Sequence, residues 1–176
     1  MRNSKPMLTL AAIFAVCGLF LASCGGGSGS GSSATTINGI SVPPEPDATQ
    51  NNATVAGVDS NSNGVRDDVE RKIAEKTNAT ENQDFTGAVA AAKVYQEIVT
   101  TNNWSADTAK QVAKRLICSS KSNYFTQESS AYKGDSISDM VANTDDRKNN
   151  LKQYTALTSG IDYADFVGAD GEIHCE

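Results

Sequence analysis

The sequence has a single histidine, and aromatic residues make up only 6% of its 176 positions. A Ser-His-Asp or Cys-His catalytic arrangement would therefore have to be built around His174, close to the C-terminus. The G-x-S-x-G, H-E-x-x-H, Walker and Rossmann patterns are also absent from the sequence. Because aromatic side chains are scarce, the core must consist largely of Ala, Val, Ile and Leu.

Basic residues are outnumbered in this chain. The 15 Lys and Arg residues face 21 Asp and Glu residues, so the formal net charge is −6. Binding of nucleic acid or of an anionic membrane surface requires a basic face. The charge balance therefore argues against nucleic acid as a partner and suits a protein that tolerates cations.

Long apolar sequence is confined to the N-terminus. Arg2 and Lys5 precede residues 8–22, which carry no charge. About 15 apolar residues are too few to cross a bilayer comfortably, which takes roughly 20, but they have the length of a signal-peptide core. We therefore predict that residues 1–23 form a signal peptide.

The apolar run closes with Leu21-Ala22-Ser23-Cys24, which resembles the lipobox of bacterial lipoproteins. The resemblance implies cleavage before Cys24 and lipidation of Cys24, which would anchor the protein to a membrane. Gly25, rather than an aspartate, follows the cysteine, and in lipoproteins this points to the outer membrane. The alternative is an ordinary secretory signal with an incidental cysteine.

The sequence after Cys24 predicts a tether. Residues 25–33 are all Gly or Ser, a composition typical of a flexible coil. Residues 35–58 contain three prolines and show no sustained apolar period, which predicts an extended segment. We therefore expect residues 24–54 to be a tether and residues 55–176 to be the folded domain.

One loop has the spacing of a calcium site. Residues 59–70 fit the pattern D-x-[DN]-x-[DN]-G-x5-E without a mismatch. Calcium takes six to eight hard oxygen ligands at about 2.3–2.6 Å, and short side chains at alternate positions of a curled backbone can supply them. Gly64 is expected to make the sharp turn. The predicted ligands, with Val65 contributing its carbonyl oxygen, are Asp59, Asn61, Asn63, Val65, Asp67 and Glu70.

The match resembles the EF-hand loop over these 12 residues only, and a similar stretch occurs near the start of many uncharacterised exported proteobacterial proteins. No helix is expected before the loop, because residues 43–57 have the wrong sequence for one. Two ligands are neutral amides and Arg66 opposes the cation, so we expect weak binding, roughly 10⁻⁴–10⁻³ M, of a structural Ca²⁺. The alternative is a surface turn rich in Asn, Asp and Gly.

The remaining sequence predicts an all-α fold. Ser105 and Thr144 are expected to be helix N-caps, and the charged run 145–148 is interpreted as the first turn of a helix. Residues 124–135 are expected to form a loop. Helices are predicted at 67–76, 84–101, from 106 onward, at 137–142 and at 145–158. The predicted architecture is a small helical bundle with one EF-hand-like calcium loop before the first helix and an irregular C-terminal tail.

Two cysteines remain after lipidation, Cys118 and Cys175. Export to an oxidising compartment makes a disulfide the expected state, and the bond would pin the tail to the bundle. It would stabilise the fold by about 2–4 kcal/mol. A redox pair is the alternative, but the C-x-x-C spacing is missing.

Two classes of function remain open. The favoured one is a calcium-stabilised, lipid-anchored cell-envelope protein, periplasmic or surface-facing, that acts as a non-catalytic interaction or structural module with an envelope protein as candidate partner. The other is an envelope hydrolase of glycan or peptidoglycan. That chemistry requires a concave pocket with two carboxylates about 5–10 Å apart.

Overall fold

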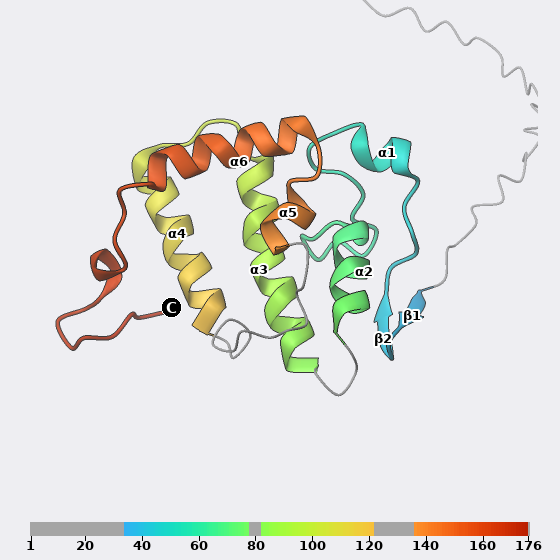
Figure 1. The fold of residues 1–176 in the computed structure, drawn as a ribbon, viewed down its shortest axis with the longest axis horizontal. Coiled ribbons are helices and arrows are strands. Elements are labelled where there is room, and N and C mark those ends of the chain that lie inside the picture. The colour runs from blue at the N-terminus through green and yellow to red at the C-terminus, as the bar shows by residue number, and fades with distance from the viewer. Residues whose placement is uncertain (1–33, 78–81, 122–135, 176) are drawn as a thin grey trace, which may run out of the picture. The chain divides into compact units, whose positions relative to one another are not determined.

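A computed structural model describes residues 34–77, 82–121 and 136–175 of the chain (Figure 1). The signal peptide, Cys24 and the loop predicted at 124–135 lie outside these residues. The described part is mostly helical, with a two-stranded hairpin at its start. Its helices are α1 (Ala48–Asn52), α2 (Asp67–Lys76), α3 (Asn82–Thr100), α4 (Ala106–Lys121), α5 (Ile137–Val141) and α6 (Asp145–Thr158).

Helix α3 lies at the centre and contacts α2, α4, α5 and α6. Small side chains, among them the fully buried Ala88, Ala91 and Ala92, let the neighbouring helices approach it closely. One apolar cluster joins α3 to α2 and α5, and a second joins α3 to α4 and to Tyr154 of α6. Helix α6 runs across one end of α3 and α4 (Figure 1).

The helix predictions are confirmed closely at two sites. Helix α2 spans Asp67–Lys76, with acidic residues in its first turn and Lys76 in its last, as the helix dipole favours. Helix α6 ends at Thr158, and the Thr144 hydroxyl accepts a hydrogen bond from the Arg147 N–H (3.4 Å). The Ser105 hydroxyl likewise accepts from the Thr108 N–H (3.1 Å).

The prediction of an extended segment is wrong for much of residues 35–54, because two strands and a short helix form there. Strands β1 (Thr35–Ile37) and β2 (Ile40–Val42) form an antiparallel hairpin. Asn38 and Gly39 make its turn with φ of +50° and +83°, the two-residue turn that Asn-Gly favours. The fold is therefore not purely α-helical.

The hairpin belongs to the bundle. Ile40 and Val42 are buried and pack against Ala74 of α2. The Asn38 side-chain amide donates to the carbonyls of Ala74 and Thr77 (3.1 and 3.0 Å) at the end of the same helix. These contacts satisfy carbonyl groups that the helix itself leaves without partners.

A short helix also precedes the candidate calcium loop, where none was expected. Asp47 caps α1 by accepting a hydrogen bond from the Gln50 N–H (2.9 Å). Five residues are too few for a helix that is stable in isolation. Its formation therefore depends on tertiary contacts that the local sequence does not reveal, and Arg147 supplies them, as described below.

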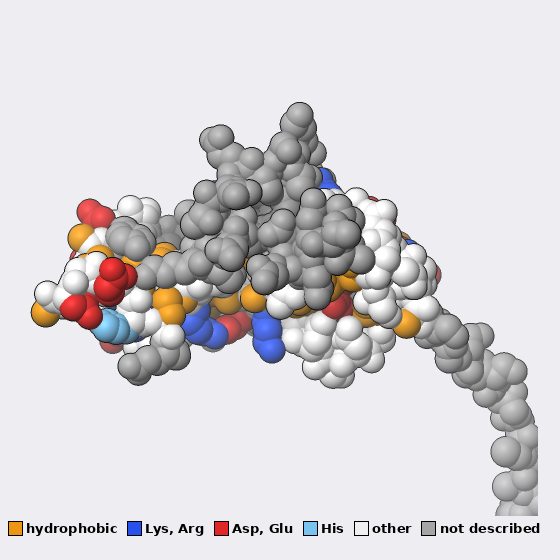
Figure 2. Space-filling model, turned by 90° about the horizontal axis from the view of Figure 1, so that it is seen from below, with side chains coloured by type: hydrophobic (Ala, Val, Ile, Leu, Met, Phe, Trp, Pro, Cys, Tyr) orange, Lys and Arg blue, Asp and Glu red, His pale blue; other side chains and the backbone are white. Residues whose placement is uncertain are grey.

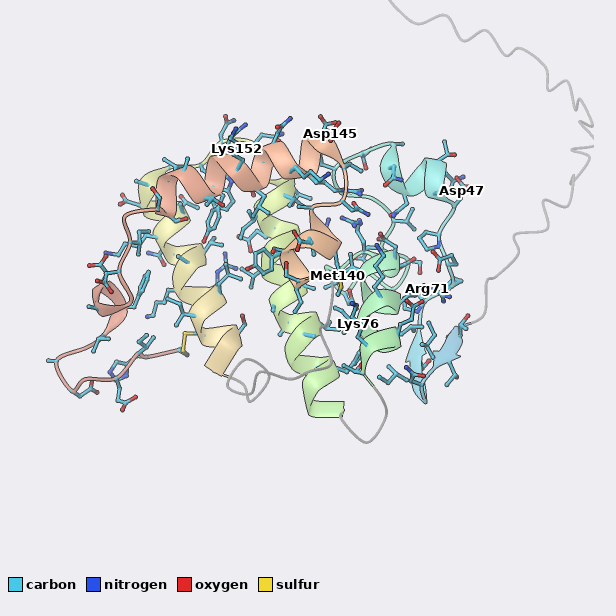
Figure 3. All side chains as sticks on the ribbon, in the orientation of Figure 1. Asp47, Arg71, Lys76, Met140, Asp145 and Lys152 are labelled. Carbon is cyan, nitrogen blue, oxygen red and sulfur yellow. A yellow bond between two sulfur atoms is a disulfide. The ribbon has the colours of Figure 1, made fainter. Side chains whose placement is uncertain are left out.

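The predicted disulfide is confirmed. The Cys118 and Cys175 sulfur atoms are 1.97 Å apart and join the end of α4 to the C-terminal tail (Figure 3). The tail contains a single 3₁₀ turn, Tyr163–Phe166, and places Lys110 Nζ 5.8 Å from the centre of the Phe166 ring. Ile173 of the tail is buried. The tail is thus held to α4 by a covalent bond and by side-chain contacts.

The surface offers few apolar groups. Leu157 is the one large hydrophobic side chain that is exposed among the described residues. In Figure 2, hydrophobic atoms are scattered between charged and polar ones. No helix in the described part is both long and apolar enough to span a membrane.

Candidate metal site and the adjoining arginine network

The loop of residues 59–70 curls around the Asp59 carboxylate. Its oxygens accept hydrogen bonds from the backbone N–H groups of Asn63 (3.2 Å) and Gly64 (2.9 Å). Gly64 has φ +89°, so it makes the sharp turn that the pattern predicted. The Ser60 N–H donates to the Asp67 carboxylate (2.9 Å) and thereby ties the start of the loop to the start of α2.

Glu70 closes the loop from the first turn of α2. The side-chain amides of Asn61 and Asn63 donate to its two carboxylate oxygens at 3.1 and 2.7 Å. The oxygen atoms of the same two amides accept backbone N–H groups. A carbonyl oxygen has two lone pairs, so each amide oxygen can still accept a second bond or bind a cation.

Three carboxylates of this loop have no ion-pair partner among the described residues. Asp67 and Glu70 are 1% and 4% exposed. No Lys, Arg or His in the described ranges forms an ion pair with Asp59, Asp67 or Glu70. Burial raises the pKa of Glu70, the amides of Asn63 and Asn61 lower it, and the charges of Asp67 and Asp59 raise it further. Buried carboxylates without cationic partners are costly, and a bound cation would remove that cost.

The predicted ligands are thus brought together to different degrees. Asp59, Asn61, Asn63 and Glu70 are joined by direct hydrogen bonds or by their loop backbone, and Asp67 is tied in through Ser60. The Val65 side chain is fully buried in the core, which leaves its backbone to face the loop. A group of three or more Asp, Glu, Cys or His side chains arranged for a metal is not found within the described residues, and the Glu70 oxygens are occupied by the amides of Asn61 and Asn63.

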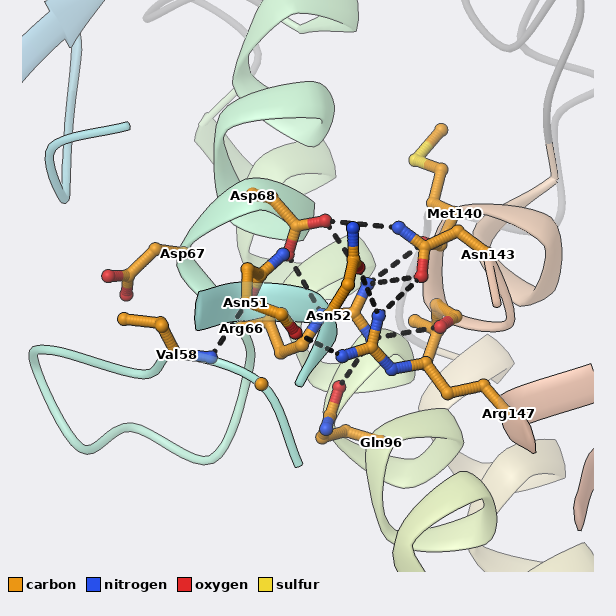
Figure 4. Close-up of polar contacts among 12 residues, drawn as sticks. Asn51, Asn52, Val58, Arg66, Asp67, Asp68, Gln96, Met140, Asn143 and Arg147 are labelled. Atoms are coloured by element: carbon orange, nitrogen blue, oxygen red, sulfur yellow. Dashed lines mark hydrogen bonds and ion pairs between the residues drawn. The ribbon is translucent and has the colours of Figure 1, made fainter. Parts of the chain in front are cut away.

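Arg66 does not act as the sequence suggested. Its guanidinium group is fully buried and donates to the Asp68 carboxylate at 2.9 and 3.2 Å (Figure 4). It also donates to the carbonyls of Val141 (2.9 Å) and Met140 (3.3 Å) at the end of α5. Burial acts to raise the pKa of Asp68, but the hydrogen bond and charge of Arg66 lower it below its ordinary value. The positive charge is therefore paired within the protein and does not simply oppose a cation in the loop.

Arg147 lies in the first turn of α6, as the sequence suggested, and is also fully buried. Burial and the charge of Arg66 lower its pKa to about 10, so the side chain remains protonated at neutral pH. All five of its N–H donors have oxygen partners, at 2.6–3.2 Å. These partners are the carbonyls of Asn51, Thr54 and Val55 and the side-chain oxygens of Asn52 and Asn143.

Sequence reasoning missed this arginine network, which we define as Arg66, Asp68, Asn143 and Arg147. Each guanidinium group binds carbonyls at the C-terminal end of a five-residue helix, Arg66 those of α5 and Arg147 those of α1. Positive charge is favourable at that end of a helix. The partners lie more than 70 residues away in the sequence, so no local pattern could have shown the arrangement.

A pocket of about 370 Å³ lies between the loop and α3, and Asp59 and Glu97 both line it. Paired carboxylates in a pocket are what the hydrolase alternative requires. Both groups have partners, however: Asp59 accepts two backbone N–H groups, and both Glu97 oxygens bind Arg115 at 2.5 and 2.7 Å. His174 is exposed in the tail beside Asp170 (2.9 Å). Nothing in this geometry favours catalysis over cation binding.

Comparisons with protein-family models, with curated proteins and with solved structures find no match for this chain. Its function is therefore inferred from its own residues.

Proposed function

We propose that the protein is a calcium-stabilised, lipid-anchored module of the bacterial cell envelope, with an interaction or structural role. The observation that supports calcium binding is the loop of residues 59–70, where Asp59, Asp67 and Glu70 accept amide N–H groups but have no cationic partner in the described part of the chain. The lipobox-like sequence before Cys24 supports the anchor. The Cys118–Cys175 disulfide is consistent with an oxidising compartment outside the cytoplasm.

The donor set suits Ca²⁺ better than other common cations. Every predicted donor atom is an oxygen, whereas zinc prefers thiolate and imidazole ligands. The donors come from flexible side chains and one carbonyl, whereas Mg²⁺ demands a small octahedral site and retains several waters. Asp59, Asp67 and Glu70 would balance the charge of the ion, and the amide oxygens of Asn61 and Asn63 with the Val65 carbonyl would complete the shell.

The role of the ion is structural in this proposal. The loop leads directly into α2, and Asp67 and Glu70 lie in the first turn of that helix. A cation there would remove the repulsion among the carboxylates and hold the loop against α2. Binding in the range of 10⁻⁴–10⁻³ M would keep the site filled where calcium is abundant and would not serve as a micromolar switch.

A calcium titration tests the site. Isothermal titration of the purified protein should show binding of one Ca²⁺, and Glu70→Gln should abolish it. Glu75→Gln is a matched control, because Glu75 is an exposed residue of the same helix. Equal binding by both variants, or no binding by the native protein, would contradict the proposal.

The anchor and the interaction role need separate experiments. Mass spectrometry of the native protein should detect a lipidated N-terminal cysteine, and Cys24→Ser should release the protein from the membrane fraction. Affinity capture from solubilised envelopes, with calcium and with chelator, should recover a reproducible partner. Failure to recover one under either condition would count against an interaction role while leaving calcium binding intact.

A further inference from the structure

The start of α2 serves the loop and the arginine network at the same time. Asp67 and Glu70 take part in the hydrogen bonds of the loop. Arg66 and Asp68, their neighbours in the sequence, take part in those of the network. Neighbouring residues on an extended or helical backbone point in different directions. A movement of this short segment therefore changes both groups of contacts.

The network reaches from there to α5 and α6 through Asn143. The Asn143 side-chain oxygen accepts hydrogen bonds from Arg66 (3.2 Å) and from Arg147 (2.6 Å), as Figure 4 shows. Its amide nitrogen donates to Asp68 (3.3 Å). Asn143 thus joins the first turn of α2 to the first turn of α6, which is distant in the sequence.

Arg147 returns the chain of contacts to the loop. It binds the carbonyl groups of residues 51, 54 and 55, just before the loop. The Asn51 side chain accepts from the Val58 N–H (2.9 Å), and the Val58 carbonyl accepts from the Asp67 N–H (2.9 Å). The hydrogen bonds therefore form a closed ring that begins and ends at the start of α2.

The ring is tightly packed around its two arginines. Gly57 has φ +69°, and a side chain there would lie 2.2 Å from Arg66 Cδ and 2.9 Å from Arg147 Nη2. Both arginines are fully buried. The ring therefore has little freedom to rearrange one contact without disturbing the others.

We propose that this ring couples cation binding in the loop to the docking of α5 and the start of α6, with Asn143 as the positioning residue. The inference rests on the calcium site proposed above. Binding of the ion fixes Asp67 and Glu70 and with them Arg66 and Asp68, whose partners are on α5 and at the start of α6. By linkage, the factor by which calcium stabilises this docking equals the factor by which the docking strengthens calcium binding.

Hydrogen exchange of the full-length protein tests the coupling. Calcium should slow amide exchange about tenfold in residues 59–70 and also in residues 137–147, a value within the range of coupled sites. Residues 106–116 of α4 are the internal reference, because none of them is a member of the loop or of the ring. In Asn143→Ala, calcium should still slow exchange in the loop but no longer in residues 137–147. Isothermal titration should show binding about tenfold weaker than in the native protein.

Asn150→Ala is the matched control. Asn150 lies on α6, the helix that follows Asn143, and donates to the Val99 carbonyl (2.6 Å), outside the ring. It should keep both the affinity and the distant protection. Slowed exchange confined to residues 59–70 of the native protein would overturn the coupling, and this result requires no variant to fold. Equal calcium affinity in Asn143→Ala and the native protein would also overturn it and would leave the calcium site standing. If the native protein shows no calcium binding, the site and the coupling both fail.

Discussion

Two groups of charged side chains lie next to each other at the start of α2. The charges of one group are paired within the protein, and those of the other are not. In the arginine network, every guanidinium N–H of Arg147 has an oxygen partner, and Arg66 is paired with Asp68. In the loop, Asp59, Asp67 and Glu70 have amide partners but no cationic one in the described part of the chain. A completed group needs nothing from solution and is structural, whereas an uncompensated one is a place for a ligand. This contrast predicts that the two groups respond differently to mutation and to calcium.

The largest effect is expected at the completed group. Arg147→Met would remove the arginine donor from four oxygen atoms before the loop and leave the Asn143 oxygen with Arg66 as its remaining donor. Removal of one member of such a network costs about 3–5 kcal/mol of unfolding free energy. Urea unfolding in chelator, followed by circular dichroism, measures the loss.

Lys148→Met is the control for that experiment. Lys148 is the next residue on the same helix and is exposed, so its replacement should change the stability by no more than about 0.5 kcal/mol. A loss below about 1 kcal/mol in Arg147→Met would show that water replaces the missing donors. The group would then not be the structural centre described here.

A smaller effect on the free energy of unfolding is expected at the uncompensated group, and its sign should differ between calcium and chelator. In 10 mM calcium, the native protein should gain about 1.4–2.7 kcal/mol for dissociation constants of roughly 10⁻³–10⁻⁴ M. Glu70→Gln should gain nothing from calcium. In chelator, the same variant should be more stable than the native protein by about 1 kcal/mol, because a buried charge beside two others has been removed.

Thermal unfolding of both proteins, in calcium and in chelator, gives the four free energies of unfolding to be compared. The order of stability should reverse between the two conditions. Parallel shifts of the native protein and Glu70→Gln would mean that calcium acts elsewhere, and a Glu70→Gln variant less stable in chelator would mean that the loop is already balanced.

The same contrast explains which parts of the fold were predictable from the sequence. The ends of α2 and α6 depend on local chemistry, namely the order of charges and the Thr144 cap. Both helices were therefore predicted from the local sequence. The hairpin was missed although Asn38-Gly39 is a strong local turn signal, because its strands have only three residues each. Helix α1 could not have been predicted, because the carbonyls of its last turn and of the residues just after it are held by Arg147, more than 90 residues away.

The candidate site divides in the same way. A loop of 12 residues can be recognised from spacing alone, because its donors are close in the sequence and Gly64 is required at the turn. The burial of Arg66 and Arg147 depends on the assembled bundle. Without that knowledge, Arg66 appeared to weaken a cation site, whereas its charge is taken up by Asp68. The turn at Gly64 could therefore be predicted from the sequence, whereas the distant charge compensation could not.

A further substitution would sharpen the comparison by making the loop still less balanced. Asn63→Asp replaces an amide that donates to Glu70 with a fourth carboxylate. In chelator the variant should lose about 0.5–1 kcal/mol through repulsion between the two carboxylates. In calcium the added charge should strengthen binding about fivefold, because affinity in such loops rises with the number of charged ligands. Calorimetric titration at fixed ionic strength measures both the affinity and the heat; weaker binding would mean that the Asn63 side chain does not face the ion.

The smallest effect is expected for an arginine that forms an equally good ion pair outside the network. Arg115 binds both oxygens of Glu97, but the two side chains are 51% and 41% exposed. In water-accessible surroundings such a pair contributes about 0.5 kcal/mol, because solvent replaces the lost partner and salt screens the attraction. Arg115→Gln should therefore cost about one sixth to one tenth of what Arg147→Met costs in the same urea experiment. A similar loss in both variants would mean that burial of the network adds nothing to the stability contributed by its hydrogen bonds.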